Sequence, residues 1–256
     1  MHYWVVMPAA GVGRRFGSAK QYALLDDRTV LQTALQVFLD DPQCRGGSVL
    51  LASADAQRRQ LAAQLPERIM LVDGGSERAH SVCNGLRSLE ARAGADDWVL
   101  VHDAVRPALS AADLQRLLRH GAADAVGALL ATPVADTVKR AHPDVAGGGV
   151  RRCDATLPRE SLWLAQTPQM FRYAALRSAL ERALADGRTP TDEAQAMEWQ
   201  GQAALLVQAQ DSNLKITTAA DLALLQAILR QRSDQGIAQG SGQGSGHAEL
   251  SNGIAQ

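Results

Sequence analysis

Apolar residues along the first half of the chain fall into two alternating patterns. Short apolar runs, bounded by polar or glycine-rich turns, occur at residues 5–7, 48–52, 69–72, 98–101 and 125–130. Such runs are typical of parallel strands that are buried on both faces. Several segments between them repeat apolar residues every three or four positions, the spacing of a helix with one buried face. The alternation predicts an α/β fold, a doubly wound, mostly parallel sheet with helices on both faces.

The predicted helices of this half have recognisable apolar faces and caps. Residues 30–38 repeat apolar side chains at helical spacing, and residues 56–65 fit a shorter helix. Ser76 is a plausible N-cap for a helix with apolar residues between Ala79 and Leu89. Ser110 and Asp113 together resemble a capping box for the next helix. These helices supply the two layers that the predicted strands need.

Three polar or glycine-rich turns follow predicted strands, at residues 8–13, 73–76 and 102–107. Because the carboxyl ends of parallel strands lie at one edge of a sheet, the three turns are expected to meet there. Ligands of such sheets bind beyond those strand ends. Spacing alone therefore predicts a ligand site at this edge.

The strand–helix alternation stops between Pro133 and Arg159. No helical period is present there, and a run of three glycines occupies residues 147–149. We interpret residues 134–140 and 150–156 as two strands of a β-arm, at about 134–159, with the glycines near its tip. A surface loop is the alternative, and composition alone does not separate the two.

The second half of the domain returns to a mixed pattern. Residues 176–184 predict a helix, and Thr191-Asp192-Glu193 resembles the start of another, with acidic residues in its first turn. Residues 204–207 and 214–216 predict short strands. Thr218 and Asp221 resemble a capping box that opens a last helix.

Length and composition limit the domain organisation. A chain of 256 residues suits one large α/β domain or two small ones. We assign one domain to residues 1–232. Residues 233–256 are rich in Gly, Ser and Gln and contain few apolar residues, so we predict a disordered tail.

Charge and cysteine content exclude several functional classes. A net charge of −1 gives no overall attraction to nucleic acid or to an anionic membrane, so any anion site must be a local cluster of cations. No secretory signal or membrane-spanning run is visible. Cys44, Cys83 and Cys153 have neither disulfide-framework nor metal-ligand spacing. A cytoplasmic location is expected.

The turn after the first strand carries the clearest candidate chemistry. Pro8 ends the strand because it has no N–H to donate. Small residues follow, so backbone N–H groups can approach a ligand closely, and cations flank them. The small residues are Ala9, Ala10, Gly11 and Gly13, and the cations are Arg14, Arg15 and Lys20. This combination suggests a polyphosphate site, although an ordinary strand-to-helix turn with surface cations would look similar.

Two common phosphate-binding loops do not fit this turn. The P-loop requires Gly-Lys followed by Ser or Thr, whereas Lys20 lies between Ala19 and Gln21. The dinucleotide fingerprint requires glycine where Phe16 stands, and the acidic residue expected about 20 residues later is missing. The turn is therefore neither of these loops, and its residues alone favour phosphate binding only modestly over an ordinary strand-to-helix turn.

The turn resembles the signature loop of nucleotidyltransferases, in the form Pro8-Ala9-Ala10-Gly11-x-Gly13-x-Arg15 followed by Lys20-Gln21-Tyr22. The closest resemblance is to the 2-C-methyl-D-erythritol 4-phosphate cytidylyltransferase family, over roughly residues 3–230. Ala19 departs from the pattern, which usually has proline there. The resemblance implies a nucleotide-diphospho-sugar transferase fold, which is Rossmann-like. It also implies transfer of CMP from CTP to methylerythritol phosphate, with release of pyrophosphate, in the non-mevalonate isoprenoid pathway.

The same resemblance assigns roles to residues in the three turns. Arg15 and Lys20 correspond to the cations that stabilise the transition state. Gly75, Ser76 and Ser81 match the turn and helix start that recognise cytosine. The family's His-Asp-Ala-x-Arg-Pro motif is present at residues 102–107, where an Asp–Arg pair that only shapes the turn is the alternative. The CTP-binding positions are then Ala9, Ala10, Gly11, Gly13, Gly75, Ser76, Ser81, Asp103 and Ala104.

The acceptor phosphate is expected to be held by a separate group of residues. By resemblance these are Arg106, Thr137, Arg159 and Lys215. The family's arm interlocks with that of a second subunit, which implies a homodimer and contacts across it. Mg²⁺ would be held mainly by the CTP phosphates, because no metal site made of protein ligands alone is visible. Thr167 and Thr191 also match family motifs, and we expect them to form a turn and a helix cap.

Three other functions remain to be weighed. A ribitol 5-phosphate cytidylyltransferase would use nearly the same cations with another acceptor. A nicotinamide-dependent oxidoreductase is disfavoured by the broken dinucleotide fingerprint. A non-catalytic nucleotide-binding regulator would not need Arg15 and Lys20, yet both are present.

Overall fold

The first strand, β1 (Tyr3–Pro8), lies inside a seven-stranded sheet and contacts the hydrophobic core on both faces. The computed structural model describes residues 1–11, 19–142 and 150–241. Tyr3, Val5 and Met7 belong to one core cluster, whereas Trp4 and Val6 belong to the other. Successive side chains of a strand point to opposite faces, so β1 is covered by apolar residues on each side. This matches the continuous apolar run in the sequence.

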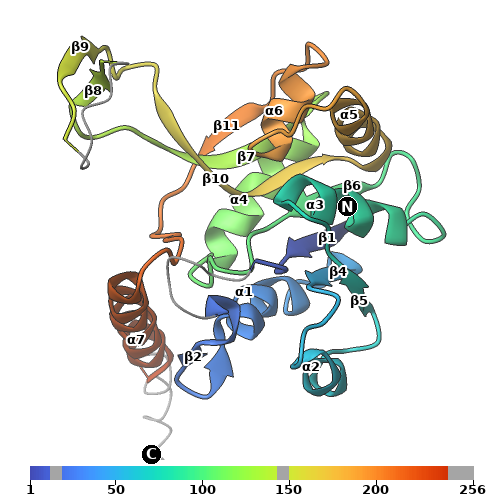
Figure 1. The fold of residues 1–256 in the computed structure, drawn as a ribbon. Coiled ribbons are helices and arrows are strands. Elements are labelled where there is room, and N and C mark those ends of the chain that lie inside the picture. The colour runs from blue at the N-terminus through green and yellow to red at the C-terminus, as the bar shows by residue number, and fades with distance from the viewer. Residues whose placement is uncertain (12–18, 143–149, 242–256) are drawn as a thin grey trace, which may run out of the picture.

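The sheet is mostly parallel, as predicted. Its strand order is β11-β7-β10-β6-β1-β4-β5 (Figure 1). β1 pairs in parallel with β4 and β6, β4 with β5, and β7 with β11. The strands besides β1 are β4 (Cys44–Leu51), β5 (Ile69–Asp73), β6 (Trp98–Val101), β7 (Gly127–Pro133), β10 (Trp163–Arg172) and β11 (Leu205–Gln208).

Helices cover both faces of this sheet. Buried residues of α1 and α4 belong to the core cluster that contains Tyr3, and those of α3 and α5 belong to the cluster that contains Trp4. The doubly wound arrangement predicted from the sequence is therefore confirmed. The helices are α1 (Val30–Leu39), α2 (Arg58–Gln64), α3 (Arg78–Ser88), α4 (Ala111–Ala122), α5 (Tyr173–Ala185), α6 (Glu193–Glu198) and α7 (Ala219–Ser241).

A strand that the sequence pattern did not predict lies near the middle of the sheet. β10 pairs antiparallel with both β6 and β7. Pro168 lies within it and cannot donate a ladder hydrogen bond, which is why this segment looked like a turn. The pairing with β7 accommodates the proline through a register shift between Ala165 and Gln169.

The arm, defined here as residues 134–142 and 150–159, extends away from the sheet (Figure 1). It contains two antiparallel strands, β8 (Val138–Ala141) and β9 (Cys153–Leu157). Two strands were predicted in this region, although the observed ones are shorter and begin three or four residues later. The glycine run at 147–149 lies outside the described residues.

Two predictions near the C-terminus were wrong. The segment from Leu214 to Ile216 is not a strand, although the Ile216 N–H donates to the carbonyl of Val105. α7 continues through Ser241 instead of ending near Arg232, so the first part of the predicted tail is helical. The residues after Arg232 include Gln and Ala, which are compatible with a helix once the preceding turns have nucleated it.

Smaller elements connect β1 to α1. A short 3₁₀ helix, η1 (Lys20–Tyr22), is followed by a hairpin of β2 (Leu24–Leu25) and β3 (Arg28–Thr29). Thr29 then caps α1 in a complete capping box with Gln32. Among the described residues, no helix combines the length and apolar character needed to cross a bilayer.

Candidate active site

A cleft of about 220 Å³ lies at the carboxyl ends of β1, β5 and β6. All three turns singled out in the sequence contribute to it, which supports the predicted ligand edge. Its lining combines small residues with charged ones. The lining residues are Pro8, Ala9, Ala10, Gly11, Lys20, Gln21, Gly75, Ser76, Glu77, Arg78, Ser81, Asp103, Ala104, Val105 and Lys215.

The turn after β1 forms one wall of the cleft. The Ala9 N–H donates to the carbonyl of Leu50 at 2.8 Å, which continues the pairing of β1 with β4. Gln21 Nε2 donates to the Ala9 carbonyl at 2.9 Å and so fixes the start of the loop against η1. Gly13 and Arg15 lie outside the described residues.

The turn after β5 forms the opposite wall and depends on glycine. A Cβ at Gly74 would lie 2.5 Å from the Ala10 Cβ, and one at Gly75 would lie 2.3 Å from the His80 Cβ. The Gly75 N–H donates to Ser81 Oγ at 3.0 Å, so the serine on α3 shapes the turn. Any larger side chain would push these two walls apart.

Ser76 does not cap α3, contrary to the prediction. The N-cap is Glu77, and its side chain makes no capping hydrogen bond. The Ser76 hydroxyl instead lies 3.3 Å from His80 Nδ1. Ser76 lines the cleft, while the turn itself is held through the Ser81 hydroxyl.

Lys20 and Lys215 approach the cleft from distant parts of the sequence. Lys20 Nζ donates to the backbone carbonyl of Ile216 at 2.7 Å. Lys215, the preceding residue, donates through Nζ to Asp103 Oδ2 at 2.8 Å. The segment after β11 therefore brings the two ammonium groups to one side of the cleft, and no regular strand is needed for this.

Asp103 is the acidic centre of the cleft. Its side chain is 8% exposed, and its two oxygens accept from different cations. Arg78 Nε donates to Oδ1 at 3.1 Å, and Lys215 Nζ donates to Oδ2. Burial opposes ionisation of this carboxyl, but the charges of Arg78 and Lys215 outweigh it and hold the pKa of Asp103 well below its usual range. Asp103 is therefore a fixed negative charge.

The backbone around Asp103 is held by buried polar residues. The Asp103 N–H donates to Thr167 Oγ1 at 3.0 Å, and that oxygen also lies 3.1 Å from His102 Nδ1. His102 Nε2 lies 3.0 Å from the carbonyl oxygen of Arg106. Burial lowers the pKa of His102 to about 4, so the ring is neutral at physiological pH. His102 shapes the turn and is not among the residues that line the cleft.

Arg106 lies behind Asp103 instead of lining the cleft. One terminal nitrogen donates to the Asn213 carbonyl at 2.7 Å. Its Nε lies 3.7 Å from Asp103 Oδ2 and makes no hydrogen bond within the described part of the chain. These contacts tie the turn after β6 to the segment before Lys215. The geometry thus shows that Arg106 shapes the turn, whereas the phosphate contact predicted for Arg106 stays a prediction.

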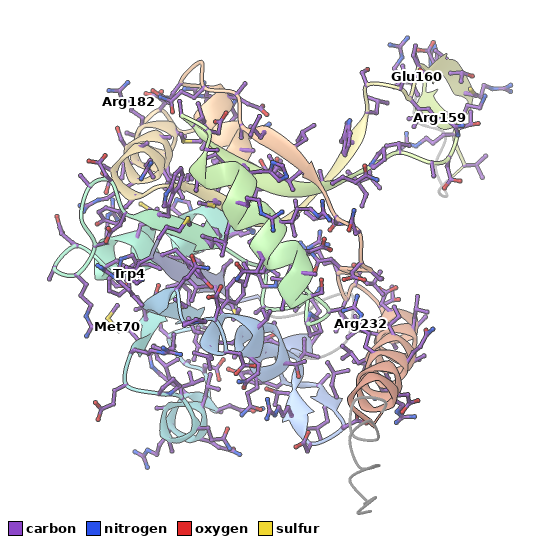
Figure 2. All side chains as sticks on the ribbon, turned by 180° about the vertical axis from the view of Figure 1, so that it is seen from behind. Trp4, Met70, Arg159, Glu160, Arg182 and Arg232 are labelled. Carbon is purple, nitrogen blue, oxygen red and sulfur yellow. The ribbon has the colours of Figure 1, made fainter. Side chains whose placement is uncertain are left out.

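The other two predicted acceptor residues, Thr137 and Arg159, are on the arm. Neither lines the cleft of the same chain. Arg159 is exposed and donates to the carbonyl of Ala135, within the arm itself. Figure 2 shows Arg159 and Glu160 far from Trp4 and the central sheet. Within one chain, the residues predicted to bind the acceptor are therefore divided between the cleft and the arm.

The ion pair between Arg78, which lines the cleft, and Glu193 was not predicted from the sequence. Arg78 donates from its two terminal nitrogens to the carboxylate of Glu193 at 2.7 and 3.0 Å. Burial raises the pKa of Glu193, and the charge of Arg78 opposes that effect. A signal was present, because a cation in the first turn of a helix opposes the dipole and needs an anionic partner.

The predictions for Thr167 and Thr191 need correction. Thr167 lies in β10 and supports the Asp103 backbone, so it does more than form a turn. The N-cap of α6 is Asp192, whose side chain accepts from the Gln195 N–H, instead of Thr191. The acidic side chain is one residue closer to the first helical turn and reaches the free N–H groups there.

This arrangement suits binding and stabilisation of a polyphosphate. Fixed cations, small backbone turns and one ionised carboxylate share the cleft, and no cluster of three or more metal-ligating side chains occurs among the described residues. A neutral buried histidine and a fully paired carboxylate are poorly placed to exchange protons. The site therefore supports electrostatic catalysis better than acid–base catalysis.

Comparisons with known proteins agree with this picture. The chain matches the family model of 2-C-methyl-D-erythritol 4-phosphate cytidylyltransferase (IspD) over residues 3–231. It is 48% identical over 236 residues to the 2-C-methyl-D-erythritol 4-phosphate cytidylyltransferase of Ectopseudomonas mendocina, covering 91% of this chain and 98% of that protein. The enzyme of the same name from Pseudomonas aeruginosa is 50% identical over 227 residues, covering 88% and 94%.

Solved structures give the same result. A crystal structure of 4-diphosphocytidyl-2C-methyl-D-erythritol synthase has a TM-score of 0.76 and 33% identity, covering 89% of this chain and 98% of that one. The Thermus thermophilus cytidylyltransferase gives a TM-score of 0.71 at 30% identity, covering 90% and 100%. The resemblance inferred from the signature loop is confirmed, and the chain belongs to the 2-C-methyl-D-erythritol 4-phosphate cytidylyltransferase family of nucleotidyltransferases.

Proposed function

We propose that this protein transfers CMP from CTP to 2-C-methyl-D-erythritol 4-phosphate, in the non-mevalonate isoprenoid pathway. The products are 4-diphosphocytidyl-2-C-methyl-D-erythritol and pyrophosphate. Family membership supports this assignment, and the cleft adds a physical reason. The main observation in support of this function is that Lys20, Asp103 and Lys215 line one cleft beside two narrow backbone turns.

The chemical step needs positioning more than proton transfer. An oxygen of the acceptor's phosphate monoester attacks the α-phosphorus of CTP, and the bond to the pyrophosphate oxygen breaks. A phosphate monoester has its second pKa near 6, so the nucleophile is already ionised at pH 7. Negative charge is shared among the α-phosphoryl oxygens and the leaving group, where fixed cations stabilise it. We assign this role to Lys20 and, by resemblance, to Arg15.

Cytosine would lie against the turn after β5. Backbone groups of Gly75 and Ser76, together with the start of α3, offer donors and acceptors at fixed positions. The close approach of Gly74 to Ala10 leaves a narrow opening, which disfavours a purine by its size. The loop at Ala9, Ala10, Gly11 and Gly13 would then face the phosphates.

The cleft also fits a Mg²⁺ ion that is bound mostly by the nucleotide. Asp103 is a buried, ionised carboxylate in the lining, and Mg²⁺ in phosphate sites is commonly held by one or two carboxylates plus phosphate oxygens. When bound, the ion would neutralise phosphate charge. Each carboxylate oxygen has a second acceptor position, so Asp103 would contact the ion while Lys215 stays beside it and faces the acceptor phosphate.

A second copy of the chain is the proposed source of the remaining acceptor contacts. Thr137 and Arg159 are on the arm, which extends away from the central sheet (Figure 2), and neither lines the cleft of its own chain. We propose a homodimer in which each arm reaches the partner's cleft beside Lys215. We also propose a cytoplasmic location, in keeping with three free cysteines.

Pyrophosphate release tests the proposed reaction directly. The protein is supplied with CTP and Mg²⁺ in three separate assays. These contain methylerythritol phosphate, ribitol 5-phosphate or no acceptor. We expect rapid release only with methylerythritol phosphate. Preference for ribitol 5-phosphate would overturn the acceptor assignment, and the family's relatives argue against it. No release with any acceptor would support a non-catalytic regulator.

A further inference from the structure

Glu193, a carboxylate outside the cleft, is linked to it by a continuous series of charged contacts. Glu193 is 1% exposed and accepts two hydrogen bonds from Arg78. The remaining side-chain nitrogen of Arg78, Nε, donates to Asp103, and the other oxygen of Asp103 accepts from Lys215. The series therefore runs from a buried helix start to the ammonium group at the edge of the cleft.

Glu193 is held in place from both sides. The residue before it, Asp192, accepts from Gln169 Nε2 at 2.9 Å. The residue after it, Ala194, donates its N–H to Gln169 Oε1 at 2.8 Å. Gln169 belongs to β10, the strand whose Thr167 also supports the Asp103 backbone. Glu193 and Asp103 are thus both held by the same strand.

The two-point contact with Glu193 determines what Arg78 can offer to Asp103. A guanidinium group is planar, so pairing both terminal nitrogens with one carboxylate fixes its plane, and in this orientation Nε is the nitrogen that donates to Asp103. Asp103 then receives one hydrogen bond from Arg78 and keeps Oδ2 for Lys215. Without the charge of Glu193, Arg78 would be free to pair with Asp103 at both oxygens and displace the lysine.

We propose that Glu193 is a positioning residue for the acceptor end of the cleft. Glu193 does not line the cleft itself, but it contacts Arg78, which does, and it acts through Arg78 and Asp103 on Lys215. This inference rests on the proposed function and adds Glu193 to it as a residue that takes no direct part in the reaction. The competing explanation is that the pair only stabilises the fold, as many buried ion pairs do.

Glu193→Gln in the full-length protein separates these explanations, because it keeps shape and hydrogen bonding but removes the charge. We expect kcat/KM for methylerythritol phosphate to fall about tenfold, comparable to the loss of a supporting residue in metal sites. KM for CTP should change less than twofold. In a Lys215→Met background the same substitution should have no further effect, because the group on which Glu193 acts is gone.

A matched control is available on the surface. Glu181 on α5 pairs with Arg87 at 3.1 Å and with Arg177 at 3.2 Å, and it does not line the cleft. Glu181→Gln removes a paired carboxylate charge in the same way and should leave both kinetic constants unchanged. If Glu193→Gln does not fold, Glu193→Asp keeps the charge on a shorter side chain. It should lower kcat/KM about threefold in the wild-type background and not at all with Lys215→Met.

Two outcomes would overturn the positioning role. One is an unchanged kcat/KM in Glu193→Gln, and the other is an equal loss with and without Lys215, which a purely structural role predicts. The wild-type protein is assayed alongside. Failure of wild type to release pyrophosphate would refute the proposed function, whereas failure of the Glu193 prediction in an active enzyme refutes only this inference.

Discussion

The cleft and the arm carry similar polar and charged residues but hold them in different ways. In the cleft, Asp103 is buried and contacts cations from two other parts of the chain, and its backbone is held by β10. On the arm, Arg140 pairs with Asp154 across two exposed strands, and Arg159 contacts only the arm's own backbone in the described residues. Charges of the cleft are positioned by the folded domain, whereas those of the arm are positioned only within the arm.

This difference indicates which half of the reaction each region serves. Binding and activating a triphosphate requires cations fixed in advance, because preorganised charge needs no rearrangement during the reaction. In the proposed dimer, the side chains of the arm would be positioned against the cleft of the second chain. We therefore expect substitutions in the cleft to reduce turnover. Substitutions on the arm should either weaken acceptor binding or have no effect.

The largest effect is expected for Lys20→Met. This change removes an ammonium group positioned by the Ile216 carbonyl, and loss of one such donor costs about 2.7–4 kcal/mol in other enzymes. Turnover should fall roughly 10²–10³-fold. Steady-state pyrophosphate release measures it, with Lys139→Met on the arm as the matched control. A Lys20→Met enzyme within a few-fold of wild type would show that this lysine is not catalytic.

The pH dependence of stability should reveal the buried histidine under the cleft. The unfolded chain protonates His102 near pH 6.5, whereas the folded protein does so only near pH 4. Its contribution to stability is complete above pH 6.5 and is lost as the pH falls toward 4. The loss over that window is about 3 kcal/mol.

Urea unfolding between pH 4 and 8 measures this loss, and His102→Gln should flatten the curve in the same window. An NMR titration gives an independent check of the ring itself. A His102 ring that titrates at its ordinary pKa in the folded protein would contradict the buried, neutral assignment.

A smaller effect is expected for Arg159→Ala, and it tests whether the arm acts on a second chain. Loss of one charged hydrogen bond to the acceptor phosphate should raise KM for methylerythritol phosphate about tenfold and leave turnover nearly unchanged. Mixing this variant with Lys20→Met should form heterodimers that contain one cleft with both residues intact. At acceptor concentrations well below KM, activity of the mixture should exceed that of either variant, and a strictly additive result would show that the arm does not act in trans.

The smallest effect is expected for the exposed ion pair of the arm. Arg140→Gln breaks its 2.7 Å contact with Asp154, where the arginine side chain is 60% exposed. Exposed pairs contribute at most about 1 kcal/mol and often nothing measurable. Thermal unfolding and kcat/KM should therefore stay close to wild type. A large change in either would mean that this pair is buried against a partner.

The elements that depend only on the local sequence pattern were predicted correctly. Trp98–Val101 is an uninterrupted apolar run, and it forms a strand buried on both faces. Ser110 is followed by Asp113, and it caps α4 as predicted. The meeting of the three turns at one edge followed from parallel topology, which needs no long-range information beyond strand direction.

The remaining features depend on contacts between distant residues, which no local pattern contains. β10 includes Pro168 and reads as a turn until its two neighbouring strands are known. Residues 214–216 were predicted to form a strand, in which a buried Lys215 would need an anion. The anion, Asp103, is present, but the strand is not. Arg78 and Glu193 are 115 residues apart, so their pairing emerges only in the fold.

A crystal structure of the protein with CTP and Mg²⁺ tests the central claim most directly. We predict cytosine against Gly75 and Ser81, and phosphates beside Ala10, Gly11 and Lys20, in the cleft at the carboxyl ends of β1, β5 and β6. A nucleotide bound anywhere else, or bound in this cleft with its phosphates turned away from Lys20, would contradict the account.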